Sequence, residues 1–364
     1  MTVAAFMNLA LYHPIHGYYA RAVRRSGRAG DFFTSVDVGA LFGELLESQI
    51  AEMAFLLRRS PSDPFDLVEA GAGNGRLAAD IMSVAARRDP AVHARTRLHL
   101  VEASPPARAA QSTVLGPDAD RLASSGADLP AAFEGVLLAN ELLDALPVHQ
   151  VVMRDEGLRE MFVAVSDDRL ATIEGPLSTV ALQQYFDDLE ITLEAGWRVE
   201  VNLLARDWIA EAVRRLQRGF IILIDYGHPA RELYSVTHSS GTLTSFSRHV
   251  MGGPEGGSAT PLWLEQPGER DITAHVDFTT VQRAAEKAGA VTLGFLDQTY
   301  FLMGLIDGVD LGAGLTPAAQ MKQRLALKTL LLPGGLGSTF KVLVLGKDVG
   351  HPALKGCSHR ARVT

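Results

Sequence analysis

The sequence predicts an α/β protein whose central sheet is mostly parallel and doubly wound, with helices on both faces. Short apolar runs alternate with segments of helical composition along much of the chain. Several of these runs are apolar almost without interruption, as expected of strands that are covered on both faces. The first run ends in a loop with a glycine at every second position, which is typical of a strand that turns sharply into a helix.

The alternation can be followed element by element from residue 65. Residues 65–69 form a short apolar run that ends in glycines, and residues 76–88 have helical composition, so together they predict a strand, a tight loop and a helix. Residues 97–102 predict a second strand, which ends on a carboxylate. The helix over 105–115 begins at a proline, a residue favoured in the first helical turn.

The later elements continue the pattern. Residues 135–139 and 219–225 are near-continuous apolar runs and predict buried strands. The last third of the chain predicts a helix over 278–288, a strand over 290–296 and a β-rich run over 339–346. We expect the last two of these segments to form a pair of strands that closes the sheet.

Some segments do not follow the alternation, and we interpret them as additions to the core. A structureless loop of more than about 15 residues is usually functional or disordered, so the Gly/Pro/Ser-rich segment 228–270 is a candidate lid. The polar tail predicts disorder. The predicted organisation is a helical N-terminal cap over 1–60, a core over 61–147 and 200–347, an inserted β/α cap over 148–199 and a flexible tail over 348–364.

Composition and charge argue against several classes of protein. The chain has 364 residues, and none of its apolar runs approaches the roughly 20 residues that span a bilayer, so we expect no membrane association. Its start lacks the features of a secretory signal, which predicts a cytoplasmic protein. The formal net charge of −8 disfavours nucleic acid as a partner. A protein or a small molecule is the expected partner, and a homodimer stays open.

The glycine loop is the first candidate binding element. Gly71, Gly73 and Gly75 follow the first strand and precede a helix, where their missing side chains let a ligand approach the backbone. The spacing differs from the Gly-x-Gly-x-x-Gly of dinucleotide-binding proteins and lacks the lysine of a phosphate-binding loop. A tight turn without a ligand is the alternative interpretation.

Glu102 ends the second strand, about one βα unit after the glycine loop. A carboxylate at this place can accept hydrogen bonds from both hydroxyls of a ribose. A solvated acid at a strand end is the alternative, and the neighbouring glycine loop disfavours it. With Glu69, this residue makes an acidic site that would repel a pyrophosphate and favour a nucleoside bearing an amine and a sulfonium.

Polar side chains follow the next two strands. Asn140, Glu141 and Asp144 come after one of them, and the two acids would share a face of a helical turn, where they could grip a cation together. A helix N-terminus that merely favours acids is equally open. His228 comes after the other strand, at the same edge of the sheet. The remaining candidates in this region, His249, His275 and Asp277, are scattered, and scattered histidines are more often structural.

Other chemistries find little support. The lone Cys357 cannot form an internal disulfide or a cysteine-based metal site. No metal-ligand spacing emerges, so we expect no metal. No nucleophile elbow with a Ser-His-Asp order is present, which disfavours a hydrolase.

Taken together, these residues resemble the MidA-like methyltransferases over roughly residues 6–347. The Gly-Asp-Phe and Thr-Ala-His-Val-Asp-Phe blocks are more specific than the glycine loop. The matching blocks are Phe6-Met7, His13-Pro14, Gly17-Tyr18-Tyr19, Gly30-Asp31-Phe32-Phe33-Thr34-Ser35, the glycine loop, Val101-Glu102-Ala103-Ser104, Ala139-Asn140-Glu141, Asp144-Ala145-Leu146-Pro147, Asp225-Tyr226-Gly227, Gly241-Thr242-Leu243, Thr273-Ala274-His275-Val276-Asp277-Phe278 and Phe340-Lys341-Val342-Leu343.

The resemblance implies a Rossmann-like class I methyltransferase core with a seven-stranded sheet and added cap segments. It also implies S-adenosylmethionine as the methyl donor and, in characterised relatives, a protein arginine as the acceptor. The three loop glycines would seat the cofactor, Glu102 would take its ribose, and the segment around Asp31 would fold over it. The expected cofactor-binding residues are Asp31, Thr34, Glu69, Gly71, Gly73, Gly75, Glu102, Ser104 and Asn140.

The chain departs from the family pattern beside the expected acceptor site, where Leu142 and Leu143 replace two aromatic residues. The resemblance therefore supports the identity of the cofactor more strongly than it supports arginine as the acceptor. Methyl transfer is an in-line displacement, for which Glu141 and Asp144 would orient a guanidinium. The first alternative is a small-molecule O-methyltransferase, in which His228 or His249 would deprotonate a hydroxyl. The second is an assembly protein that keeps the fold without catalysis.

Overall fold

The structure is a computed structural model, and the chain divides into two compact units. The core unit comprises Phe33–Leu142, Ala210–Tyr226 and Ala285–Thr364, and the second unit comprises Met1–Phe32, Leu143–Ile209 and Gly227–Ala284. The residues that the structure describes are 1–21, 34–60, 62–247, 250–252, 261–308, 316–332, 337 and 340–359.

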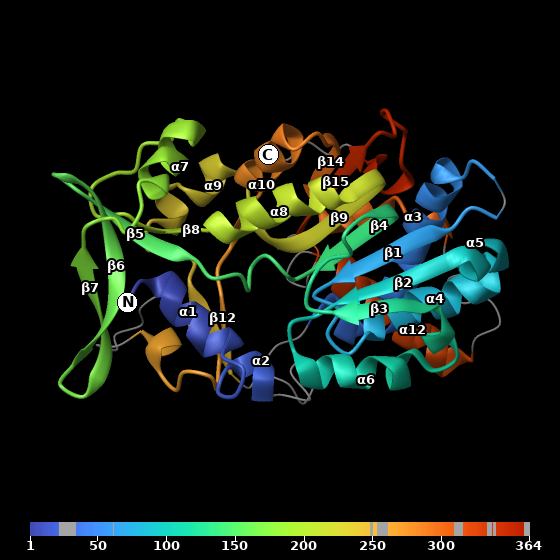
Figure 1. The fold of residues 1–364 in the computed structure, drawn as a ribbon, viewed down its shortest axis with the longest axis horizontal. Helices are drawn as coiled ribbons and strands as arrows, with labels where there is room; N and C mark the ends of the chain where they lie inside the picture. Colours follow the sequence, from blue (N-terminus) through green and yellow to red (C-terminus); the bar gives the residue numbers. More distant parts are fainter. Residues whose placement is uncertain are drawn as a thin grey trace. The chain divides into compact units, whose positions relative to one another are not determined.

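A mostly parallel sheet forms the centre of the core unit (Figure 1). Along this sheet the strands lie in the order β14, β15, β9, β4, β1, β2 and β3. Neighbouring strands from β9 to β3 are parallel, whereas β15 runs antiparallel to both β9 and β14. The bounds are Phe65–Ala70 for β1, Thr96–Val101 for β2, Leu122–Gly126 for β3, Phe133–Asn140 for β4, Leu216–His228 for β9, Val291–Asp297 for β14 and Phe340–Lys347 for β15.

This order confirms the predicted seven-stranded, mostly parallel sheet and its closing pair of strands, β14 and β15, which the structure shows to be antiparallel. Within the described ranges an eighth strand, β13 (Val276–Asp277), pairs with the last two residues of β9. Buried side chains alternate between the two faces: Leu67 and Val136 lie in the main apolar cluster, and Leu137 on the opposite face is also buried. Apolar cover on both faces explains why the middle stretches of β4 and β9 are continuously apolar.

The sequence sets the starts of the core helices. Helix α4 (Arg76–Arg88) begins after Gly75, which is its left-handed N-cap. The Ser104 hydroxyl caps α6 (Pro105–Leu115) by accepting from Ala107 N, and a proline occupies the first turn, as predicted. The other helices of this unit are η1 (Ser35–Val38), α3 (Ala40–Leu57), α5 (Pro90–Arg95), η2 (Gly116–Arg121), α11 (Gln298–Met303), η5 (Ile306–Gly308), α12 (Pro317–Leu331) and η6 (Lys355–Cys357).

The second unit contains two antiparallel sheets among its described residues. One has the order β7 (Arg169–Gly175), β6 (Gly157–Ser166), β5 (His149–Arg154) and β8 (Arg198–Val201). The other has the order β11 (Val250–Gly252), β10 (Thr244–Ser247) and β12 (Asp271–Thr273). Its helices are α1 (Val3–Tyr12), α2 (Tyr18–Arg21), α7 (Ala181–Leu189), α9 (Ala230–Leu233), η3 (Val236–His238) and η4 (Leu262–Leu264), and α8 (Leu203–Arg215) and α10 (Phe278–Lys287) have residues in both units.

The predicted domain boundaries need correction. Residues 34–57 belong with the core rather than with an N-terminal cap, and residues 227–284 group with the second unit. The segment 228–270 is not a structureless lid, because its described part contains α9, η3, β10, β11 and η4. These short elements lack the long periodic runs that reveal a helix or strand in the sequence.

The predicted flexible tail is also partly wrong. Its described part, 348–359, contains η6 and a buried Leu354, and Gly356 N donates to Gln49 Oε1 at 2.9 Å. A few buried contacts thus order a segment whose composition is polar. None of the helices in the described part of the chain has the length and apolarity needed to span a bilayer.

Candidate active site

The glycine loop connects the carboxyl end of β1 to α4. Gly71, Gly73 and Gly75 have φ values of +75°, +52° and +83°, which side chains disfavour. Gly71 N and Ala72 N both donate to Val101 O, at 2.9 and 3.1 Å, so the loop is tied to the end of β2. A Cβ added to Gly73 would meet no atom within 4 Å among the described residues. The loop therefore exposes its backbone to open space, as the sequence predicts for a ligand-binding turn.

Glu102 follows β2 and holds the loop. Its Oε2 accepts a hydrogen bond from Gly73 N at 2.9 Å, and its Oε1 accepts one from Ser104 N at 2.7 Å. Each carboxylate oxygen has a second lone pair for a further donor. The side chain is fixed by backbone donors and only partly buried. This arrangement suits a carboxylate that accepts two hydroxyls of one ligand.

Gln111 on α6 is a supporting residue that the sequence analysis missed. Its Nε2 donates to Gly73 O at 2.9 Å, and its Oε1 accepts from the Ser125 hydroxyl at 2.6 Å. The side chain is fully buried. The one sequence signal is a single side-chain amide in α6, which by itself does not say what the amide contacts.

Glu69 lies one residue before the end of β1 and turns toward α4. Its Oε2 accepts from Ala78 N at 3.1 Å. Burial, together with the charges of Glu102 and Asp80, raises the pKa of Glu69 to about 8. The protonated form therefore predominates at neutral pH. This corrects the prediction that Glu69 adds a second negative charge to the loop.

The turn after β4 has an unusual backbone. Glu141 has a φ of +53°, and its N donates to Ile224 O of β9 at 2.8 Å. The predicted helical turn over Glu141 and Asp144 is therefore wrong, because a left-handed residue cannot continue a helix. Such a conformation costs about 1–3 kcal/mol and is found disproportionately at functional sites.

Asn140, the last residue of β4, lies beside that turn. Its Nδ2 donates to Glu141 Oε1 at 3.0 Å. Its Oδ1 is buried, and no hydrogen-bond donor reaches it from the described residues. A buried amide oxygen without a donor is costly, so its position fits contact with a ligand that supplies an N–H or O–H.

Glu141 lies in an acidic environment. Its burial and the charge of Asp225 raise its pKa to about 8, while hydrogen bonds from Asn140 and the Ser35 backbone act in the opposite direction. Asp225 is itself buried, and its carboxylate accepts from Leu142 N and Tyr226 N at 3.1 and 2.9 Å. Within the described ranges no lysine, arginine or histidine lies within ion-pair distance of Glu141. Two acidic side chains thus lie together, and no cationic side chain of the described residues pairs with Glu141. Such a site favours a cationic ligand.

The short helix η1 is linked to the start of α4, which follows the glycine loop. The N and Oγ1 of Thr34 donate to Asp37 Oδ2 at 3.1 and 3.0 Å, and Arg76 pairs with Asp37 Oδ1 at 3.2 Å. The Ser35 hydroxyl donates to Gln298 Oε1 at 3.2 Å. The Thr34 hydroxyl is thus part of a helix cap. Asp31, predicted to cover the cofactor, lies outside the described residues.

The remaining predicted residues are not in the core unit. The boundary between the units falls after Leu142, so Asp144 and His228 belong to the second unit. The backbone O of the buried Asp144 accepts from Ala274 N at 3.0 Å. Asp277 accepts from the Tyr185 hydroxyl at 2.7 Å and is therefore structural. His249 lies outside the described residues.

Comparison with known proteins identifies the family. Residues 45–296 match the model of a family described as "Putative S-adenosyl-L-methionine-dependent methyltransferase". The chain belongs to this family. It is an S-adenosylmethionine-dependent methyltransferase, as the resemblance implies, and S-adenosylmethionine is its methyl donor.

Similar proteins support this assignment. The methyltransferase is 30% identical over 388 residues to the Drosophila melanogaster "Protein arginine methyltransferase NDUFAF7 homolog, mitochondrial", covering 94% of this chain and 80% of that protein. It is also 30% identical to the Mus musculus "Protein arginine methyltransferase NDUFAF7, mitochondrial", covering 98% and 83%. A crystal structure of a Burkholderia thailandensis protein bound to S-adenosyl-homocysteine superposes with a TM-score of 0.85 at 28% identity, covering 100% of this chain and 92% of that one.

The core unit of the methyltransferase fits this cofactor. The space beside Gly73 is open, Glu102 keeps lone pairs for hydroxyls, and the Asn140 amide oxygen is buried without a donor from the described residues. All three lie at or just beyond the carboxyl ends of parallel strands, where open α/β sheets bind their ligands.

Proposed function

We propose that this methyltransferase transfers a methyl group to an arginine side chain of a protein, with its donor held by the glycine loop, Glu102 and Asn140. The acceptor assignment rests on the surroundings of the Glu141 carboxyl. It lies beside the buried Asp225 and has no cationic side chain of the described residues within ion-pair distance. A guanidinium is a permanent cation with a planar set of donors, so it complements such a pair of acids.

Similar proteins support the same acceptor. The relatives from Drosophila melanogaster and Mus musculus are named protein arginine methyltransferases, and this chain covers at least 80% of each of them. The acid that would receive the guanidinium, Glu141, is followed by Leu142 and Leu143, where the sequence departs from the pattern of the family that it resembles.

Residues of the chain would contribute mainly by alignment. When bound, the donor would supply a methyl group on a sulfonium: as an acceptor nitrogen bonds to the methyl carbon in line, the C–S bond would break to leave the neutral thioether, and that nitrogen would release one proton to water. Glu141 would hydrogen-bond the guanidinium and hold positive charge on the nitrogens that do not attack. A guanidinium beside Glu141 would lower the pKa of this carboxyl, so that acceptor binding itself favours the ionised form.

A different acceptor would give His228 a role. His228 would act as a general base only if the acceptor were a hydroxyl. A rise in rate with pH near the imidazole pKa, lost in His228→Gln, would therefore favour small-molecule O-methylation over arginine methylation.

A labelling experiment tests the acceptor class. The purified protein is incubated with isotopically labelled S-adenosylmethionine and a cell lysate that has been separated into protein and metabolite fractions. We expect mass spectrometry to locate the label on arginine in the protein fraction. The Glu141→Gln variant should lose this label, while Glu194→Gln, which changes an exposed acid, should keep it. Label confined to the metabolite fraction would overturn the proposal.

A further inference from the structure

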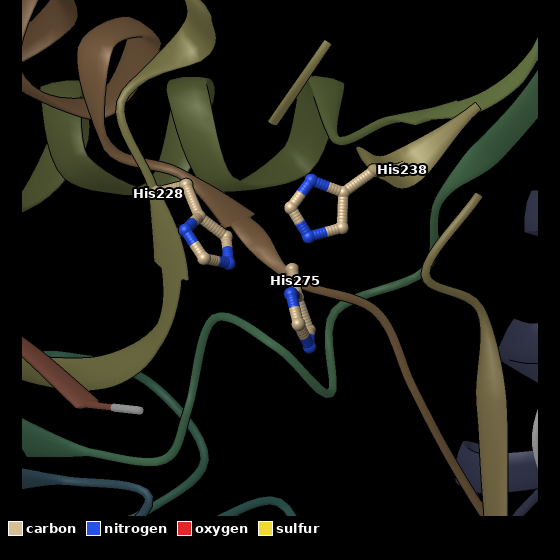
Figure 2. Close-up of side chains that lie close together, drawn as sticks. All are labelled: His228, His238 and His275. Atoms are coloured by element: carbon tan, nitrogen blue, oxygen red, sulfur yellow. The ribbon is translucent and has the colours of Figure 1, made fainter. Parts of the chain in front are cut away.

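Three histidines that are distant in sequence gather in the second unit. His228 ends β9, His238 ends η3, and His275 immediately precedes β13. One ring nitrogen from each can be chosen so that all three lie within 4.8 Å of one another. Figure 2 shows that the rings converge and that each directs a nitrogen toward the others. The sequence analysis missed this cluster because the spacings between its members match no metal motif.

Hydrogen bonds fix the segments that carry these histidines. In the pairing of β13 with β9, Asp277 is opposite His228, which places residue 275 beside the end of β9. The backbone N of His275 donates to the Thr242 hydroxyl at 3.0 Å. This hydroxyl donates in turn to the buried Glu200 at 3.1 Å. The backbone that carries the rings is thus held in place by hydrogen bonds.

In two of the rings, the nitrogen that faces away from the cluster makes the kind of hydrogen bond that is found in metal-bound histidines. His228 Nδ1 lies 2.8 Å from Glu232 Oε1, and His238 Nδ1 lies 3.1 Å from the backbone O of Glu232. Because both partners are acceptors, each Nδ1 donates its N–H to them, and Nε2 is then the nitrogen through which the neutral ring would bind a metal ion. Histidine ligands of metals almost always donate their second N–H to a carboxylate or a backbone carbonyl.

We propose that His228, His238 and His275 bind one divalent transition-metal ion of the zinc class. Three imidazole ligands suit zinc and leave a fourth position for water or another ligand. Zinc–nitrogen bonds of about 2.0–2.1 Å require the ring nitrogens to close in by roughly 1 Å or more, which small side-chain rotations achieve. The His228 side chain is 19% exposed, so an ion can reach the cluster from solvent.

Metal uptake by the full-length protein tests the proposal. The protein is prepared without a histidine tag, stripped with a chelator, and titrated with Zn²⁺ alone by calorimetry and with Co²⁺ alone by visible spectroscopy. We expect one equivalent of Zn²⁺ and the d–d absorption of a four-coordinate Co²⁺ site. Bound Zn²⁺ should also raise the thermal unfolding temperature, since it binds the native state.

Matched variants assign the site. His275→Ala and His238→Ala should each weaken Zn²⁺ binding at least 100-fold, and Glu232→Gln should weaken it about 10- to 100-fold through the outer hydrogen bond to His228. His16→Ala serves as the control, because His16 is exposed and stacks with His13 outside the cluster. Circular dichroism verifies folding, and the pair of alanine variants keeps the test valid if one of them unfolds. Absence of stoichiometric uptake, or equal affinity in folded His238→Ala and wild type, would overturn the proposal.

Discussion

Gly73 N donates a hydrogen bond to Glu102 Oε2 at 2.9 Å. The carboxylate that would take the cofactor ribose thus also fixes the loop that would seat the cofactor. Because the other carboxylate oxygen accepts from Ser104 N, the side chain holds both the glycine loop and the start of α6. The three parts of the proposed cofactor site are therefore mechanically coupled through one residue.

The first prediction concerns this coupling. Glu102→Gln replaces one acceptor oxygen with an NH₂ group that faces a backbone donor, so the hydrogen bond from either Gly73 N or Ser104 N is lost. We expect S-adenosylmethionine affinity to fall about 10- to 100-fold, equivalent to roughly 1.4–2.8 kcal/mol. Calorimetric titration measures the change. Wild-type affinity in a folded Glu102→Gln protein would contradict the assigned role.

Much of the core could be predicted from sequence because its signals are local. The helices over 76–88 and 105–115 have visible starts at Gly75 and Pro105, and the strands are apolar runs that need cover on both faces. Glu102 was identifiable because its place at a strand end has a defined meaning.

Other features depend on contacts that are distant in sequence. The left-handed turn at Glu141 follows from its N–H bond to Ile224 of β9, which no local pattern specifies. The loop contact of Gln111 and the approach of His228 to His275 likewise arise only when the chain is folded. The order of residues 348–359 depends on a few contacts such as Gly356 to Gln49.

A second prediction separates backbone strain from loss of the ligand space. Gly73→Ala places a methyl group in the open space beside the loop, at a φ of +52°. Gly350→Ala serves as a control, since Gly350 has a φ of +64° and equally open surroundings. Each variant should lose about 1–2 kcal/mol of stability in urea unfolding. Only Gly73→Ala should also weaken cofactor binding, and equal affinities in both variants would count against a ligand at the loop.

The third prediction concerns Gln111. Gln111→Leu keeps the side chain's approximate size but leaves Gly73 O and the Ser125 hydroxyl without this partner. Losing buried hydrogen-bond partners costs about 1–3 kcal/mol, so the free energy of unfolding should fall by that amount. Cofactor affinity should fall with it, because the loop loses a support. Unchanged stability in urea unfolding would show that the amide contributes no net stabilisation.

The fourth prediction is a dependence of stability on pH. The pKa of Glu141 is about 8 in the folded protein, above its ordinary value of 4.5, so the folded state holds this proton between pH 4.5 and 8 while the unfolded state releases it. Stability from this group is therefore present at low pH and is lost as pH rises toward 8. Its contribution should decline by about 1.4 kcal/mol per pH unit.

The Glu141→Gln variant isolates this contribution. Glu69, whose pKa is also about 8, produces a similar decline and remains in the variant. The free energy of unfolding of Glu141→Gln should therefore fall less steeply between pH 5.5 and 7.5 than that of wild type, because this interval lies between the ordinary pKa of 4.5 and the folded-state pKa of about 8. Parallel curves for the two proteins would show that Glu141 ionises normally.

The most direct test of the central claim is a crystal structure of the protein with S-adenosyl-homocysteine. The account predicts ribose hydroxyls within hydrogen-bonding distance of Glu102 and the nucleoside against the backbone of Gly71–Gly75. A ligand bound elsewhere, with Glu102 contacting only Gly73 and Ser104, would contradict it.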